Sequence, residues 1–256
     1  MDRRGLLVWP AAQAFLEFVG ETTLILGDAI RGLFRRPFEA KETLDQMSFV
    51  GLSSVPIVSM TGFFSGAVLS LYLSKFLTQY GATPFIGGTV GLTVTREVGP
   101  VLAGIMVAAR CGSAMAAQLG TMKVTEQIDA LKMLSVNPSN YLVVPRILAG
   151  VIMLPMLALV CMWSGIVGGL LIAYSEGVPI ATFLQSLQQF LKPEDFLKGM
   201  IKGPFFGLIV ALVACQQGLR TDNGAVGVGK ATTNTVVISM VLIYISNFLL
   251  AQLLFR

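Results

Sequence analysis

Histidine is absent from this chain of 256 residues, and only 12% of its residues are charged. The chain therefore lacks the side chain that most often binds zinc and most often serves as a general base. Soluble domains contain roughly 25% charged residues. The low charge content of this chain therefore excludes a protein whose surface faces water on all sides. With 54% hydrophobic residues, the composition predicts one all-α integral membrane domain.

Cysteine and carboxylate residues are too sparse for a metal centre or an active site. The three cysteines, Cys111, Cys161 and Cys215, are far apart and lie inside apolar segments, so we expect buried small side chains rather than disulfides or metal ligands. We predict no catalytic residue, no metal site and no cofactor in this chain. The net charge of +4 is small and dispersed, which argues against nucleic acid and fits basic loops beside anionic lipid.

Five apolar segments are candidate membrane spans, because a helix needs about 20 apolar residues to cross the hydrocarbon core. They are residues 48–74, a stretch from about Phe85 or Val98 to Leu119, and residues 141–174, 199–217 and 233–254. Glycine pairs at a spacing of four residues, Gly62 with Gly66 and Gly165 with Gly169, allow a second helix to approach closely. As a motif this is weak, since glycine is common in membrane helices.

Two further helices are predicted at the membrane surface. Over residues 11–36, apolar side chains recur at helical spacing, but charged residues such as Glu17 and Glu21 interrupt them too often for a span. A helix in the membrane interface accounts for this pattern; a cytosolic helix packed on the same protein is the alternative. A second surface helix is expected over about 178–197, on the outer side. The chain thus divides into a region at 1–46 and a membrane domain at 47–256.

Residues 89–140 combine the chain's most unusual features. Arg96 and Glu97 stand at the head of an apolar segment rich in glycine and alanine. Charges inside a membrane are costly, so this pair is either a polar patch that meets a lipid headgroup or a structural anchor at the outer interface. Residues 120–136 form a short polar helix, which is either a solvated loop helix or a docking site for a soluble partner.

Lysine and arginine in the short loops favour one orientation. More of them fall on the side of the N-terminus and of residues 120–136 when the chain crosses the membrane five times. The positive-inside rule then predicts a cytoplasmic N-terminus, a cytoplasmic 120–136 helix and a C-terminus outside.

A near match to a phosphate-binding loop occurs at residues 224–231, GAVGVGKA. Ala231 stands where the motif needs a hydroxyl for magnesium, and an apolar membrane segment precedes it in place of a strand. A glycine-rich segment that enters a helix explains it better than a nucleotide site.

Two motifs identify a family resemblance. TREVGPVLAGIMVAARCGSAMAAQLGTMKVTEQIDALKML and the later GAVGVGKATTNTVV together resemble the MlaE-type permeases of bacterial ABC lipid transporters, over about residues 45–256. The resemblance implies a homodimer in the inner membrane of a Gram-negative bacterium, which moves phospholipid between inner and outer membranes to maintain lipid asymmetry. It also implies two ATPase subunits that bind ATP and magnesium, a STAS-domain protein on the ATPase, and a periplasmic ring of MCE-domain proteins.

Candidate functional residues follow from this resemblance and from amphipathic placement. The predicted lipid pocket consists of Leu69, Tyr72, Phe76, Leu77 and Tyr80, with Arg96, Glu97 and Lys202 near the headgroup. The predicted ATPase-coupling residues are Glu126, Gln127, Asp129, Ala130 and Leu131. Other functions fit less well: a secondary transporter or channel working alone would need inverted repeats and mid-membrane carboxylates, and a scaffold would not explain the 120–136 helix.

Overall fold

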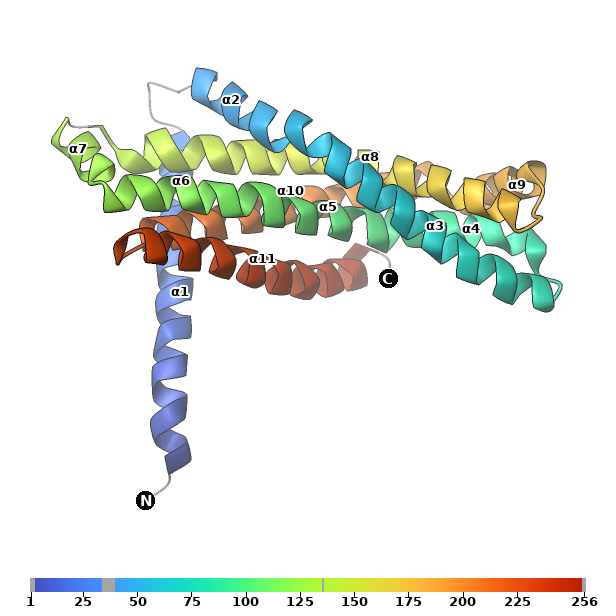
Figure 1. The fold of residues 1–256 in the computed structure, drawn as a ribbon, viewed down its shortest axis with the longest axis horizontal. Coiled ribbons are helices and arrows are strands. Elements are labelled where there is room, and N and C mark those ends of the chain that lie inside the picture. Colours follow the sequence, from blue (N-terminus) through green and yellow to red (C-terminus); the bar gives the residue numbers. More distant parts are fainter. Residues whose placement is uncertain (1–2, 34–39, 135, 255–256) are drawn as a thin grey trace.

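The computed structural model describes residues 3–33, 40–134 and 136–254, which form helices joined by short turns (Figure 1). The longer helices are α1 (Arg3–Leu33), α3 (Val55–Gln79), α8 (Val144–Ser175), α10 (Pro193–Leu219) and α11 (Gly224–Leu254). The shorter ones are α2 (Ala40–Val50), α4 (Ile86–Thr93), α5 (Gly99–Val107), α6 (Ser113–Val124), α7 (Gln127–Met133) and α9 (Ile180–Phe190). Three π-helical turns also occur, at Val94–Val98, Ala108–Gly112 and Ser139–Val143.

Five helical segments of the described chain are long and apolar enough to cross a membrane, as predicted. They are Ala40–Gln79, Thr83–Val124, Ser139–Ser175, Pro193–Leu219 and Gly224–Leu254. All are longer than expected, because flanking polar residues continue each helix beyond its apolar stretch. In its most apolar window, 61% of the second span is buried, against 11% of the fifth. The segment rich in glycine and alanine is therefore surrounded by protein, whereas α11 lies at the outside of the bundle.

Three predicted segments differ most from the structure. Residues 120–136 are not one helix: α6 extends to Val124, and the positive φ of 60° at Glu126 separates it from α7. The surface helix expected at 178–197 ends at Phe190, and Pro193 starts α10, where the Asp195 carboxylate accepts a hydrogen bond from the Lys192 backbone N–H at 3.0 Å. The glycine-rich segment before the fifth span is already helical from Gly224.

The two glycine pairs pack against each other where α3 crosses α8. A Cβ atom on Gly66 would lie 2.0 Å from the carbonyl oxygen of Gly165, and one on Gly62 would lie 2.6 Å from the carbonyl oxygen of Cys161. The backbones of the first and third spans therefore touch directly, as in small-residue contacts between membrane helices. The cysteines are fully buried, as predicted.

Replacing Gly66 by alanine is expected to destabilise the protein by about 2 kcal/mol, because the added methyl group must push two backbones apart. Thermal unfolding in detergent, followed by circular dichroism, measures this. Gly20→Ala is the matched control: nothing lies within 4 Å of a Cβ at this helical position, so we expect no loss of stability. Equal melting temperatures for Gly66→Ala and the wild type would contradict the close crossing.

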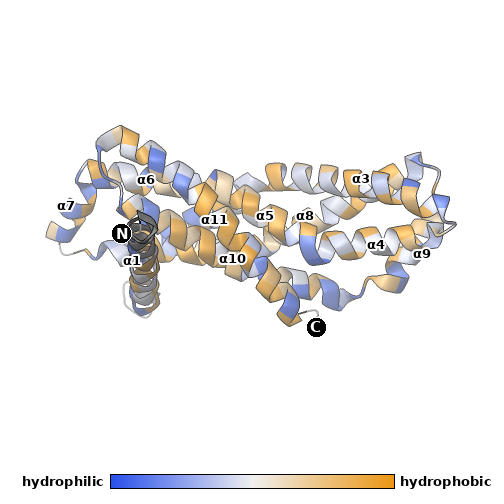
Figure 2. Cartoon of the chain, turned by 90° about the horizontal axis from the view of Figure 1, so that it is seen from below, coloured by the Kyte–Doolittle hydropathy of each residue, from blue (hydrophilic) through white to orange (hydrophobic). Residues whose placement is uncertain are grey.

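Helix α1 runs across the long axis of the bundle, near the end that carries α7 (Figure 1). Arg220, directly after α10, binds Glu17 at 3.0 Å and Glu21 at 3.6 Å, and Gln216 of α10 donates a hydrogen bond to Glu21 at 2.6 Å. Hydrophilic residues gather near the two ends of the bundle, and its middle is mostly apolar (Figure 2). If the long axis of the bundle follows the membrane normal, α1 lies parallel to the membrane surface, as an interfacial helix does.

Candidate functional sites

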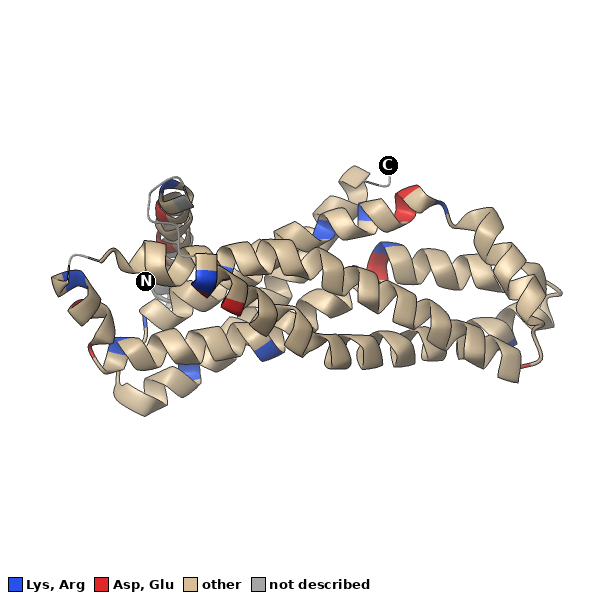
Figure 3. Ribbon diagram, turned by 90° about the horizontal axis from the view of Figure 1, so that it is seen from above, with Lys and Arg blue, Asp and Glu red and all other residues tan. Residues whose placement is uncertain are grey.

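A polar network lies inside the bundle, where charged residues are few (Figure 3). Its centre is Lys202, whose side chain is fully buried. The Lys202 ammonium donates to the Arg96 carbonyl at 2.7 Å, to a Glu97 carboxylate oxygen at 3.0 Å and to the Asn247 side-chain oxygen at 2.9 Å. The Asn247 amide in turn donates to the other Glu97 oxygen at 2.7 Å. The second, fourth and fifth spans therefore meet at one polar point.

The side chains of Arg96 and Glu97 form separate ion pairs. Arg96 forms an ion pair with Asp195 at 2.7 Å, and Glu97 forms one with Lys202. Successive side chains of a helix point about 100° apart, and the π-helical turn Val94–Val98 lets Arg96 and Glu97 reach two sites on α10. The four side chains carry two positive and two negative charges, so their formal charges cancel within the membrane domain.

Sequence reasoning missed Asp195, although one signal was available. An acidic residue three positions after the residue that precedes a helix is typical of a capping box, and Asp195 stands in that relation to Lys192. Asp195 thus caps α10 and binds Arg96 with the same carboxylate. Beside this network, Leu92, Thr93, Arg96, Glu97 and Ala251 line a cleft of about 280 Å³.

The five predicted pocket residues, four on α3 and Tyr80 directly after it, lie on two different faces. Tyr72, Phe76 and Tyr80 are 70%, 57% and 73% exposed, and the rings of Phe76 and Tyr80 are 5.0 Å apart. Leu69 and Leu77 instead pack inward against a buried cluster with α4 and α9. Within one chain these five residues do not surround one cavity, and α4 separates them along the chain from Arg96 and Glu97. Their role in lipid binding stays a prediction.

The predicted coupling residues lie on or beside α7. Glu126, Gln127, Asp129 and Ala130 are exposed, and Leu131 is half-buried. Asp129 is held by its own chain: Lys132 donates to its carboxylate at 2.8 Å, and Lys123 lies 3.8 Å away. These two cations keep the pKa of Asp129 below its usual value, so the carboxylate is ionised at neutral pH. Its role in docking is likewise a prediction.

Two apolar side chains at the end of α7 were missed as docking candidates. Met133 is 87% exposed and Leu134 is 74% exposed, whereas Ile128 of the same helix is buried. An unbroken helix over residues 120–136 would place Leu134 close to the face that carries Ile128. The short helix ends at Met133, and Leu134 leaves that face. Exposed apolar side chains next to charged ones are typical of protein interfaces.

Arg110 lies in the π-helical turn Ala108–Gly112 and binds neutral groups. Its guanidinium donates to the Phe49 carbonyl at 3.2 Å and to the Ser54 hydroxyl at 3.0 Å, and it lies 5.4 Å from the centre of the Phe49 ring. These contacts join the second span to the start of the first. The segment that resembles a phosphate-binding loop is helical from Gly224 through Lys230, so it does not form a loop that could wrap a phosphate.

Comparison with known proteins agrees with this architecture. The family described as Permease MlaE matches residues 43–253. The chain is similar to a probable ABC transporter permease protein of Rickettsia conorii, with 42% identity over 94% of both chains. It is also similar to one of Synechocystis, with 42% identity over 91% of this chain and 89% of that protein. The chloroplastic protein TRIGALACTOSYLDIACYLGLYCEROL 1 of Arabidopsis thaliana is 36% identical over 91% of this chain and 67% of its own length. Five membrane spans and these similarities place the chain in the MlaE family of ABC transporter permeases.

Proposed function

We propose that this permease moves phospholipid between the inner and outer membranes of a Gram-negative bacterium and so maintains the lipid asymmetry of the outer membrane. The observation that carries the proposal is the polar network around Lys202, which opens into the cleft at Arg96 and Glu97. A zwitterionic or anionic headgroup can exchange hydrogen bonds with such a network, while acyl chains remain on the apolar surface outside it. The name of the Arabidopsis relative includes a diacylglycerol lipid, which favours a lipid cargo.

The chain itself is a non-catalytic subunit in this proposal. ABC permeases work with ATPase subunits. Two copies of the ATPase, which bind ATP and magnesium, dock on the α7 end of a permease homodimer. A STAS-domain protein binds the ATPase, and a periplasmic ring of MCE-domain proteins receives or delivers lipid at the other end. The N-terminus is then cytoplasmic and the C-terminus periplasmic. ATP binding shifts the equilibrium between permease conformations through the docked α7.

Lipid flux through the reconstituted complex tests the role of the α3 aromatic residues. Tyr72→Glu and Tyr80→Glu place a charge on the exposed face of α3, and we expect each to lower flux about tenfold, because a buried apolar lipid contact cannot tolerate a carboxylate. Leu77→Glu is less informative, since Leu77 packs against the buried cluster and its loss also affects folding.

Tyr174→Glu is the matched control, because Tyr174 is an equally exposed aromatic residue, 61% exposed, at the end of α8. We expect it to keep normal flux. The lipid-pocket assignment fails if Tyr72→Glu and Tyr80→Glu both transport phospholipid at the rate of this control.

A further inference from the structure

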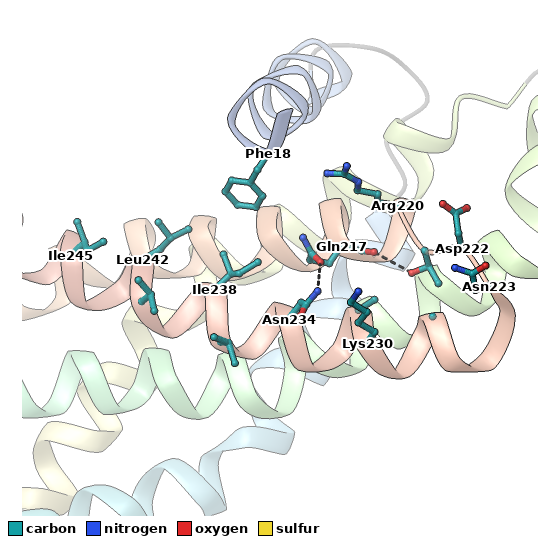
Figure 4. Close-up of a pocket in the computed structure, with 15 residues that line it drawn as sticks. Phe18, Gln217, Arg220, Asp222, Asn223, Lys230, Asn234, Ile238, Leu242 and Ile245 are labelled. Carbon is teal, nitrogen blue, oxygen red and sulfur yellow. Dashed lines mark hydrogen bonds between the residues drawn. The ribbon is translucent and has the colours of Figure 1, made fainter. Parts of the chain in front are cut away.

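A second cleft, of about 850 Å³, lies between α1, α10 and α11 (Figure 4). It is separate from the network around Lys202, with which it shares no lining residue. Its volume is within the range of roughly 300–1,000 Å³ that is usual for ligand sites. Phe18 of α1 projects toward it and forms part of its wall. The cleft is thus large enough for a headgroup and the adjoining part of an acyl chain.

The lining changes from polar to apolar along α11. Gln217, Asp222, Asn223, Lys230 and Asn234 lie at the end where α10 turns into α11. From there toward the middle of the bundle, the lining residues of α11 are all aliphatic: Val237, Ile238, Val241, Leu242 and Ile245. A membrane leaflet has the same order of polarity, from headgroup to hydrocarbon.

The two cationic side chains at the polar end of the cleft, Arg220 and Lys230, differ in their ion-pair partners. Arg220 is engaged by Glu17 and Glu21 and thereby holds α1 in place as a wall of the cleft. Lys230 is exposed, and among the side chains that the structure describes (13, 16–32, 40–134 and 136–254) none forms a hydrogen bond or ion pair with its ammonium group. Lys230 is therefore able to bind an anion, with the side-chain amides of Asn223 and Asn234 as neighbouring polar groups.

We propose that this cleft binds a membrane glycerophospholipid from the leaflet at the α7 end, with its phosphate at Lys230 and one acyl chain along Val237, Val241 and Ile245. The crosswise position of α1 supports a lipid as the occupant, because an interfacial helix lies at headgroup depth. Phe18 of α1 then covers the part of the acyl chain that is next to the headgroup. A soluble anion alone would not use the aliphatic half of the cleft. The inference shares with the proposed function only the class of ligand and does not require transport.

Native mass spectrometry of the delipidated, full-length protein in detergent tests the site by titration with phosphatidylethanolamine. We expect Lys230→Glu to weaken binding of one lipid per chain about tenfold, since a charge-assisted contact is lost. Val241→Trp fills the aliphatic half and is expected to weaken the same binding step. Lys41→Glu and Val167→Trp, at exposed positions on α2 and α8, are the matched controls and should bind as the wild type does.

Three outcomes would overturn the proposal. The first is unchanged binding in both cleft variants. The second is equal binding of diacylglycerol, which lacks the phosphate, or displacement of the lipid by millimolar inorganic phosphate, which lacks the chain. The third is that Val241→Trp changes the number of protein chains per particle but leaves lipid binding unchanged. That result would make this face an interface between two copies of the permease. The proposed function fails separately, because its test measures flux and uses α3 variants.

Discussion

Replacing Lys202 by methionine is expected to lower the free energy of unfolding by about 3 kcal/mol, which is at the low end of the range for a broken buried ion pair because Glu97 stays partly exposed. Methionine fills a similar space but cannot donate to the Arg96 carbonyl, to Glu97 or to Asn247. The Glu97 carboxylate then lacks its cation inside the bundle. Thermal unfolding in detergent should show a melting temperature lower by about 10 °C.

The double variant Lys202→Met with Glu97→Gln separates the charge from the packing. A glutamine at position 97 removes the uncompensated charge and still accepts a hydrogen bond from the Asn247 amide, which now reaches Glu97 at 2.7 Å. We expect the double variant to regain about half of the lost stability, as residues in direct contact are not additive. If the two substitutions destabilise additively, the two side chains do not act as a pair.

Leu134→Asp is expected to weaken the association of the permease with its ATPase about 30-fold, the loss of roughly 2 kcal/mol that is usual for one central interface residue. Leu134 is 74% exposed at the end of α7, so a charge there does not disturb the core of the permease. The measurement is binding of the purified ATPase to the permease in detergent, together with the ATP hydrolysis rate of the complex.

Two controls accompany this variant. Val226→Asp changes an equally apolar residue, 83% exposed, at the same end of the bundle, and we expect normal binding. Asp129→Asn should weaken binding much less than Leu134→Asp, because Lys132 and Lys123 already engage this carboxylate within the chain. A larger effect of Asp129→Asn would show that charge, rather than the apolar end of α7, governs docking.

Composition and periodicity alone predicted the membrane class, the five spans, the buried cysteines and the helix that precedes the first span. These properties follow from hydropathy summed over many residues, so a single misjudged residue changes them little. Hydropathy did not determine the helix boundaries, since a polar residue at the end of a span continues the helix as easily as it ends it. Residues 120–124 continue the second span as part of α6, and residues 193–198 begin α10 ahead of the predicted fourth span.

The pairing of side chains was decided by tertiary structure. Arg96 and Glu97 are neighbours in the chain, yet their partners, Asp195 and Lys202, come from another span. In the same way, position 66 requires glycine only because Gly165 faces it where α3 crosses α8. Hydropathy indicates which segments lie in the membrane, but the rotation of each helix about its axis depends on how all five pack. That rotation selects the side chains that meet around Lys202 and those that line the cleft beside α1.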